Sequence, residues 1–399
     1  MTATIPWLLP LAALGCLGMW PAAWPPEGPA ARPLGDVPGL ETDAPPPAGV
    51  KPGLRLTYHR MSGILGGPPR LCRLDRFGRW CGPNGESPGG KGSAGYLQAN
   101  LVGRSEKEAA IQLVFFLFEG LDSSAPTNKL ETGFVAPVGT GGDLWLHPDA
   151  LKVLLEKGAG ELVTRVTKEI EGTRYDAVQI VSMREDGRGV WIYDLGSGIL
   201  LYSSQLTATL GRFGQPETEV HFNTFQTSRQ LSIPWANEPP PPWLANVQRL
   251  DYRGQFRVDQ SGLPPSGVMP FQLGLEVLRR GTDWLHLRVT TPSDPPSGLT
   301  DTNLRVSGSQ QLCGLWIPPQ GLAKLRAGQT IDSDSLTRVV TSVSHTDGQQ
   351  VVFRLQNPRQ QAELTYRCSD GLLARAIIRE SLAVPGMSNV VELQLTGVR

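Results

Sequence analysis

The sequence predicts a mainly β (α+β) protein of two tandem domains, each an antiparallel curved sheet with one short helix packed on it. Apolar and polar residues alternate over many short segments, which is the period-two pattern of strands with one buried face. Glycine and proline are frequent, at 46 and 35 of 399 residues, as expected for many turns between short elements. Similar segments also recur in the same order on either side of a proline run at 239–242.

The clearest strand patterns lie in residues 250–258, 285–289 and 391–395, where every second residue is apolar. Asp347-Gly348 separates two β-rich runs, and this dipeptide favours a tight hairpin turn. Asp186-Gly187 has the same role earlier in the chain. Antiparallel hairpins and meanders are therefore expected in both halves.

The repeat is carried by segments whose spacing is nearly constant. The match is closest between LWLHPDAL at 144–151 and LWIPPQGL at 315–322, and between YDLGSGIL at 193–200 and YRCSDGLL at 366–373. The long period indicates duplicated domains rather than a solenoid array.

One short helix is expected in each half. Pro148 and Pro319 begin these helices, and Gly158 and Gly328 end them, as known helix preferences favour. Helices this short are marginal alone, so their leucines should dock on the apolar face of the sheet.

The predicted organisation follows from these patterns and from two proline-rich stretches. It comprises a signal peptide or lipoprotein leader (1–24), a proline-rich tether (25–52), a first β-rich repeat domain (53–236) with an Arg/Gly-rich insert at 62–103, a proline-rich linker (237–246) and a second β-rich repeat domain (247–399).

The first residues favour export to the periplasm or cell envelope. They carry no charged side chain up to Pro26 and contain a short apolar run that is typical of a signal peptide. Cys16 follows Ala13-Leu14-Gly15, similar to a lipoprotein cleavage site, so it is a lipidation candidate that would tether the protein to a membrane. An uncleaved anchor or a misplaced start codon are the alternatives.

Four further cysteines suit an oxidising compartment. Cys72 and Cys81 flank a short loop and are expected to pair. Cys313 and Cys368 are cysteines in the second half, whereas neither of the matching positions in the first half is a cysteine. Because both cysteines occur in the same half, they are also expected to pair. Four reduced thiols are the alternative.

No pattern assigns a catalytic residue, cofactor or metal. HExxH and Walker motifs are lacking, and the five histidines are scattered. Asp332-Ser333-Asp334 is interpreted as a polar turn, because the rest of a calcium loop is missing. With 37 basic and 37 acidic residues, the chain has no global field to attract nucleic acid.

Two sets of residues are candidates for ligand binding. Within the insert, arginines recur every three residues beside aromatic residues, a pattern that can grip phosphates, carboxylates or single-stranded nucleic acid; these are Arg70, Arg73, Arg76, Arg79 and Trp80. For an exported chain a negatively charged envelope polymer or lipid head group is favoured over nucleic acid, and a solvated loop is the plainer interpretation. Trp145 and Trp316 occupy matching positions and either line a ligand cavity or, more commonly, anchor the cores.

The tyrosine-turn-Gly-Leu segments at 193–201 and 366–373, in an exported chain of curved sheets and short helices, resemble LolA-like and LppX-like bacterial lipoprotein carriers. The resemblance implies a concave apolar pocket that holds acyl chains.

A non-enzymatic envelope binding module for a lipid or other apolar ligand is therefore the first functional hypothesis. A tethered structural or protein-interaction protein is the second. A hydrolase with a non-local active site is the third, since catalytic residues need not be close in sequence.

Overall fold

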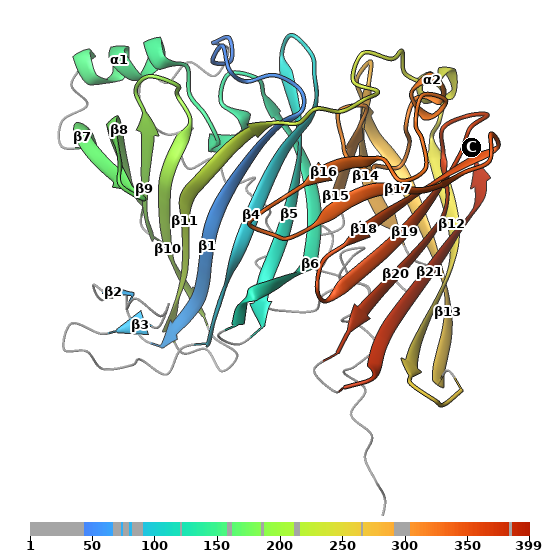
Figure 1. The fold of residues 1–399 in the computed structure, drawn as a ribbon. Helices are drawn as coiled ribbons and strands as arrows, with labels where there is room; N and C mark the ends of the chain where they lie inside the picture. Colours follow the sequence, from blue (N-terminus) through green and yellow to red (C-terminus); the bar gives the residue numbers. More distant parts are fainter. Residues whose placement is uncertain are drawn as a thin grey trace, which may run out of the picture.

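Two large antiparallel sheets form most of the protein in the computed structural model (Figure 1). The structure describes residues 44–399 except 67–72, 75–79, 82–90, 120–121, 158–161, 185–186, 211–215, 265, 291–303 and 383–384. Over this part of the chain the mainly β prediction is confirmed.

The first sheet has nine strands in the spatial order β6-β5-β4-β1-β11-β10-β9-β8-β7. Its strands are β1 (Leu54–Gly66), β4 (Lys91–Arg104), β5 (Glu108–Glu119), β6 (Asp122–Pro137), β7 (Val163–Ile170), β8 (Thr173–Arg184), β9 (Gly187–Asp194), β10 (Leu200–Leu210) and β11 (Pro216–Gln230). Two further short strands, β2 (Arg73–Leu74) and β3 (Trp80–Cys81), pair with each other.

The second sheet has ten strands in the order β15-β14-β13-β12-β21-β20-β19-β18-β17-β16. Its strands are β12 (Arg249–Gln260), β13 (Ser266–Arg280), β14 (Trp284–Thr290), β15 (Leu304–Gly308), β16 (Thr330–Ser333), β17 (Val340–Thr346), β18 (Gln350–Gln356), β19 (Gln360–Arg367), β20 (Leu373–Ser381) and β21 (Met387–Val398). Apart from the extra edge strand β16, the two orders are the same, with the first strand of each half paired to the last.

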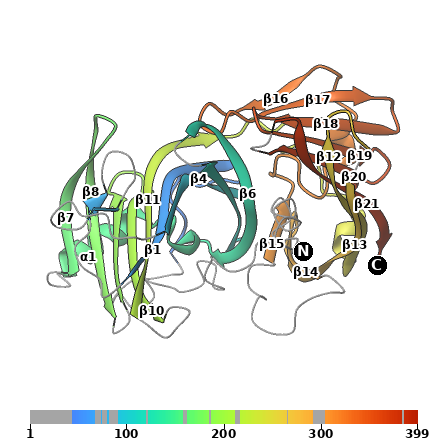
Figure 2. The same ribbon diagram turned by 90° about the horizontal axis from the view of Figure 1, so that it is seen from below.

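The strand patterns predicted from alternation are confirmed. In β12 the buried positions include Leu250, Tyr252 and Phe256, and in β14 they include Leu285, Leu287 and Val289. The Asp347-Gly348 turn joins β17 to β18, and the Asp347 N–H donates to the Gln350 carbonyl at 3.2 Å. Apolar side chains on one face of each sheet form its core, and both sheets curl around that face (Figure 2).

The same corner structure occurs at one end of each sheet. Trp145 forms an isolated bridge with Ile199, and Trp316 forms one with Leu372. Beside these bridges the Leu146 N–H donates to the Gly198 carbonyl at 2.8 Å. The Ile317 N–H likewise donates to the Gly371 carbonyl at 2.9 Å. The matching sequence segments therefore make the same backbone contacts.

The helices differ between the two halves. The first, α1 (Pro148–Lys157), has the predicted length and buries Leu151 and Leu154 in the first core. The second prediction is wrong in length: α2 (Pro319–Leu322) is a single turn. A Cβ on Gly321 would lie 2.3 Å from the Cβ of Trp235, so the glycine permits the close approach of this turn to Trp235. Two short 3-10 segments, η2 (Gly141–Asp143) and η4 (Pro242–Ala245), complete the helical elements that the structure describes.

The two sheets pack directly on each other. Val102 and Ala110 of the first sheet form a small apolar cluster with Trp284 and Val306 of the second. A Cβ on Gly103 would lie 2.5 Å from the Trp284 ring, so the glycine permits this close approach. The segment after β11 also crosses over, since Leu231 and Trp235 belong to the second core. The residue boundaries given above for the domains stay a proposal.

Candidate functional site

A cavity of about 270 Å³ lies where the open side of the second sheet meets the outer face of the first. One wall is apolar and comes from the inner face of the second sheet. It consists of Tyr252, Leu273, Leu275, Val289, Leu364, Leu373, Ala376, Ile378 and Leu393. These residues are the apolar phase of alternating strands, so the period that builds the second core also builds this wall.

The opposite wall is polar and comes from four neighbouring strands of the first sheet. Its polar residues are Arg55 of β1, Gln98 and Asn100 of β4, Gln112 of β5 and Glu131 of β6, and Val114 and Phe116 of β5 add apolar surface beside them. In β4 the intervening residues Leu97, Ala99 and Leu101 face the first core. The polar phase, which alternation alone would place in water, is thus buried against the second domain, with Gln98 only 3% exposed.

A chain of hydrogen bonds crosses this polar wall. The Arg55 Nε–H donates to Asn100 Oδ1 at 2.8 Å, and the Asn100 amide donates to Gln112 Oε1 at 3.1 Å. The Gln112 amide in turn donates to Glu131 Oε1 at 2.7 Å. Each buried polar side chain therefore fixes its neighbour, which holds the wall in one arrangement.

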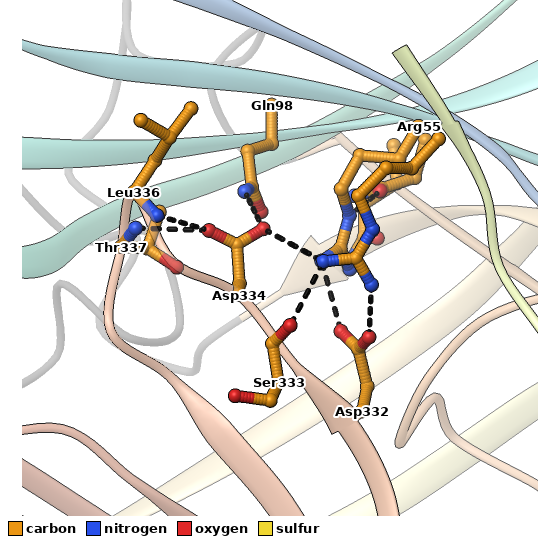
Figure 3. A network of polar contacts seen from close by, with 10 residues as sticks. Arg55, Gln98, Asp332, Ser333, Asp334, Leu336 and Thr337 are labelled. Atoms are coloured by element: carbon orange, nitrogen blue, oxygen red, sulfur yellow. Dashed lines mark hydrogen bonds and ion pairs between the residues drawn. The ribbon is translucent and has the colours of Figure 1, made fainter. Parts of the chain in front are cut away.

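Ion pairs connect this wall to the second domain, as Figure 3 shows. Arg55 Nη1 lies 3.2 Å from Asp332 Oδ2 and 3.3 Å from Asp334 Oδ2. Arg229 of β11 also pairs with Asp332. Gln98 donates to Asp334 Oδ2 at 2.9 Å. We call these five residues the interdomain latch.

Arg55 and Asp334 of the latch are buried, and this perturbs their charges. Burial is the largest influence on Arg55 and lowers its pKa below the usual 12.5, against the opposing effect of the two aspartates. For Asp334, burial alone would raise the pKa. Backbone hydrogen bonds from Thr337 and the charge of Arg55 outweigh burial, so this pKa lies below the usual 3.8.

The latch corrects the interpretation of Asp332-Ser333-Asp334 as a polar turn. Asp332 and Ser333 belong to edge strand β16, and Asp334 follows it. The Asp334 carboxylate accepts hydrogen bonds from the N–H groups of Leu336 and Thr337 while it faces Arg55. Because sequence alone does not place the partner arginines nearby, only the acidic pattern could be seen in advance.

A cysteine lines the same cavity. Cys313 adopts a positive φ of 55°, and the matching first-half residue, Gly142, has φ 64°. Burial, and next Asp332, raise the pKa of the Cys313 thiol, so it stays protonated at neutral pH.

The predicted Cys313–Cys368 disulfide is wrong, because both cysteines are free. Their surroundings differ. Cys313 lines the cavity and lies near the charge of Asp332, whereas Cys368 follows β19 and lies near the charge of Asp347.

Positions that line the cavity with apolar residues in the second sheet are occupied by polar residues in the first sheet. Ala376 pairs with Leu393 in the second sheet, and Ser203 pairs with Asn223 at the equivalent place in the first. The Asn223 amide donates to Ser203 Oγ at 3.0 Å, and Arg60 donates to Asn223 at 3.4 Å. The apolar wall is therefore a property of the second domain.

This first-sheet cluster also gathers a histidine and a carboxylate. Arg60 Nη2 lies 3.3 Å from His221 Nδ1, and His221 Nε2 lies 3.0 Å from Glu219 Oε1. Arg60 and Asn223 stand between the Ser203 hydroxyl and the imidazole, so these contacts do not form a nucleophile–base pair. Burial is the main influence on His221 and lowers its pKa.

The predicted ligand-binding residues lie away from this cavity or outside the described structure. Trp145 and Trp316 are 1% and 0% exposed and belong to the two cores rather than to the cavity lining. Arg73 and Trp80 lie in β2 and β3, but their side chains, like that of Cys81, are not among those described. Cys16, Arg70, Cys72, Arg76 and Arg79 fall outside the described residues, as do the leader and nearly all of the tether.

Neither metal clusters nor membrane helices occur in the described part of the chain. No group of three or more His, Cys, Asp or Glu residues there could hold a metal ion. Within the same residues, no helix is both long and apolar enough to span a membrane.

Comparisons with known proteins give no family. No protein-family profile matches the chain, and no curated protein matches it. Among solved structures it is similar to a DUF3598 protein of unknown function from Nostoc punctiforme, with 8% identity, TM-score 0.15 and coverage of 85% of this chain and 95% of that chain.

Two further structures show comparable similarity. The MucA/MucB complex of Pseudomonas aeruginosa gives 10% identity, TM-score 0.20 and coverage of 86% and 89%. A double mutant of transferrin-binding protein B from Haemophilus parasuis gives 8% identity, TM-score 0.17 and coverage of 88% and 77%. At these TM-scores no common fold or function follows, and none of the three is named as a LolA-like or LppX-like carrier.

Proposed function

We propose that the protein is a non-enzymatic binding protein whose interdomain cavity holds a small amphipathic molecule. The observation that carries this proposal is the division of the cavity into an apolar wall from the second sheet and a mainly polar wall from the first. Ligand sites are commonly concave and mostly apolar, with a few placed polar groups, and they occur preferentially at domain interfaces.

The size of the cavity limits its ligand. A volume of about 270 Å³ is at the lower end of ligand pockets, which span roughly 300–1,000 Å³. One short acyl or alkyl chain with a compact head suits this space better than a lipid with two long chains. The carrier-like resemblance noted in the sequence supports an acyl ligand, and the predicted leader supports action in the periplasm or cell envelope.

Mass spectrometry tests the proposal. Full-length protein purified without detergent should show, under native conditions, an added mass that organic solvent removes, or should gain one after incubation with short-chain monoacylglycerols and fatty acids. A protein that shows only its bare mass before and after this incubation would contradict the binding role.

A second function is favoured by one separate observation. Leu263, in the turn after β12, and Val268 and Met269, near the start of β13, are 58%, 54% and 37% exposed. Exposed apolar residues close together mark protein-contact surfaces. A tethered interaction protein would lose partner crosslinking in cells when Leu263 and Val268 are changed to serine. Crosslinking that is unchanged by both substitutions would remove this candidate.

A further inference from the structure

The charges that line the cavity balance one another. Among the described lining residues the strongly ionisable side chains are Arg55, Arg305, Glu131 and Asp332, two of each sign. We propose that the cavity selects an uncharged amphiphile, with a hydroxyl- or amide-bearing head and one apolar chain, over a charged amphiphile of the same chain length. This inference rests on the proposed function and adds the chemistry of the head group.

Each charged side chain in the lining already interacts with a protein group, either a charge of opposite sign or a polar hydrogen-bond partner. Arg55 is hydrogen-bonded to Asn100 and paired with Asp332 and Asp334. Glu131 accepts the Gln112 amide at 2.7 Å and is attracted by Arg305. Arg305 donates to the Leu304 carbonyl at 2.6 Å and is 8% exposed.

A charged head would disturb this balance. It would bring one more charge into a buried site whose own charges already cancel, and removing an ion from water is costly unless a new partner compensates. A carboxylate head would meet Glu131 and Asp332, and an ammonium head would meet Arg55 and Arg305. Either ligand would therefore have to break an existing protein pair.

An uncharged head meets suitable partners. Besides the Arg55–Glu131 hydrogen-bond chain, the lining carries the side-chain amides of Gln356 and Gln361. Each amide carries both a donor and an acceptor, so together they can bond hydroxyl or amide groups without a net charge. The apolar wall opposite takes the chain.

A ligand series with one chain length tests the selectivity. Titration calorimetry at pH 7 would compare monodecanoylglycerol, decanoate and decylammonium below their micelle concentrations. Monodecanoylglycerol should bind at least about tenfold more tightly than either ion. Decanoate or decylammonium binding as tightly would overturn the inference and leave the binding role intact, whereas failure of all three to bind would count against the proposed function itself.

Two substitutions should change the preference in opposite directions. Glu131→Gln removes a negative charge beside Arg305, so decanoate should gain roughly tenfold relative to monodecanoylglycerol. Arg305→Gln should give the same relative gain to decylammonium, and either variant suffices if the other does not fold. Glu156→Gln, on the exposed side of α1, is the matched control and should keep the wild-type order. An unchanged order in a folded Glu131→Gln or Arg305→Gln protein would contradict the charge argument.

Discussion

Tyr193 and Tyr366 occupy the same place in the two sheets, and each hydroxyl donates to the backbone carbonyl at the turn before a tryptophan. Tyr193 donates to the Asp143 carbonyl at 2.9 Å, and Tyr366 donates to the Gly314 carbonyl at 2.6 Å. Both side chains are fully buried. This shared corner, together with the common strand order, ties the two halves to one backbone plan, although only the second has an open apolar face toward its neighbour.

The interdomain latch should contribute to stability. Arg55→Leu leaves Asp334 buried without its closest cation, so the free energy of unfolding should fall by about 3 kcal/mol, as for other broken buried pairs. Urea unfolding followed by tryptophan fluorescence would measure this. The matched control is Arg165→Leu, which removes an exposed strand arginine paired with Asp176 and should change little. Equal effects of both substitutions would mean that burial of the latch is unimportant.

The latch also predicts a dependence on acid. Because the pKa of Asp334 is lowered on folding, its contribution is present above the unfolded pKa of about 3.8 and is lost as pH falls through the folded value. Asp334→Asn should therefore reduce the loss of unfolding free energy between about pH 4 and pH 2. Parallel curves for wild type and variant over this range would show that Asp334 is not involved.

The glycine in each corner turn should be intolerant of a side chain. Gly371 has a φ of +74°, and a Cβ there would lie 2.0 Å from the Ile317 carbonyl oxygen. Gly348 is the control, because it has a φ of +81° but open space around it. A side chain there costs only the conformational penalty of a positive φ, which is roughly 1–2 kcal/mol. Gly371→Ala should lower the thermal midpoint clearly more than Gly348→Ala. Matching midpoints would argue against the close corner contact.

The free thiols predict indifference to reduction. Removing a native disulfide from a small domain costs about 2–5 kcal/mol, whereas Cys368→Ser in this protein should stay within about 0.5 kcal/mol of wild type under oxidising conditions. Peptide mapping after alkylation in denaturant should find both Cys313 and Cys368 modified without prior reduction. A crosslinked peptide containing both cysteines would restore the original pairing.

Much of the fold could be predicted from the sequence, because alternation in segments such as 250–258 reports directly which strand face is buried. The Leu-Trp segments also revealed the repeat. The cavity could not be predicted in this way. Gln98 and Asn100 lie on the polar phase of β4, which is the phase that water normally covers, and only the packing of the second domain turns that phase into a wall. The cysteine pairing failed for a similar reason, since matched positions in a repeat do not fix side-chain directions.

The most direct test of the binding account fills the cavity from its apolar wall. Ala376 is 3% exposed and lines the cavity, whereas Ala245 is exposed beyond it, so Ala376→Phe and Ala245→Phe form a matched pair. Calorimetric titration with monodecanoylglycerol should show binding to wild type and Ala245→Phe and at least about a tenfold loss of affinity in Ala376→Phe. Unaltered affinity in a folded Ala376→Phe protein would contradict the placement of the ligand between the two sheets.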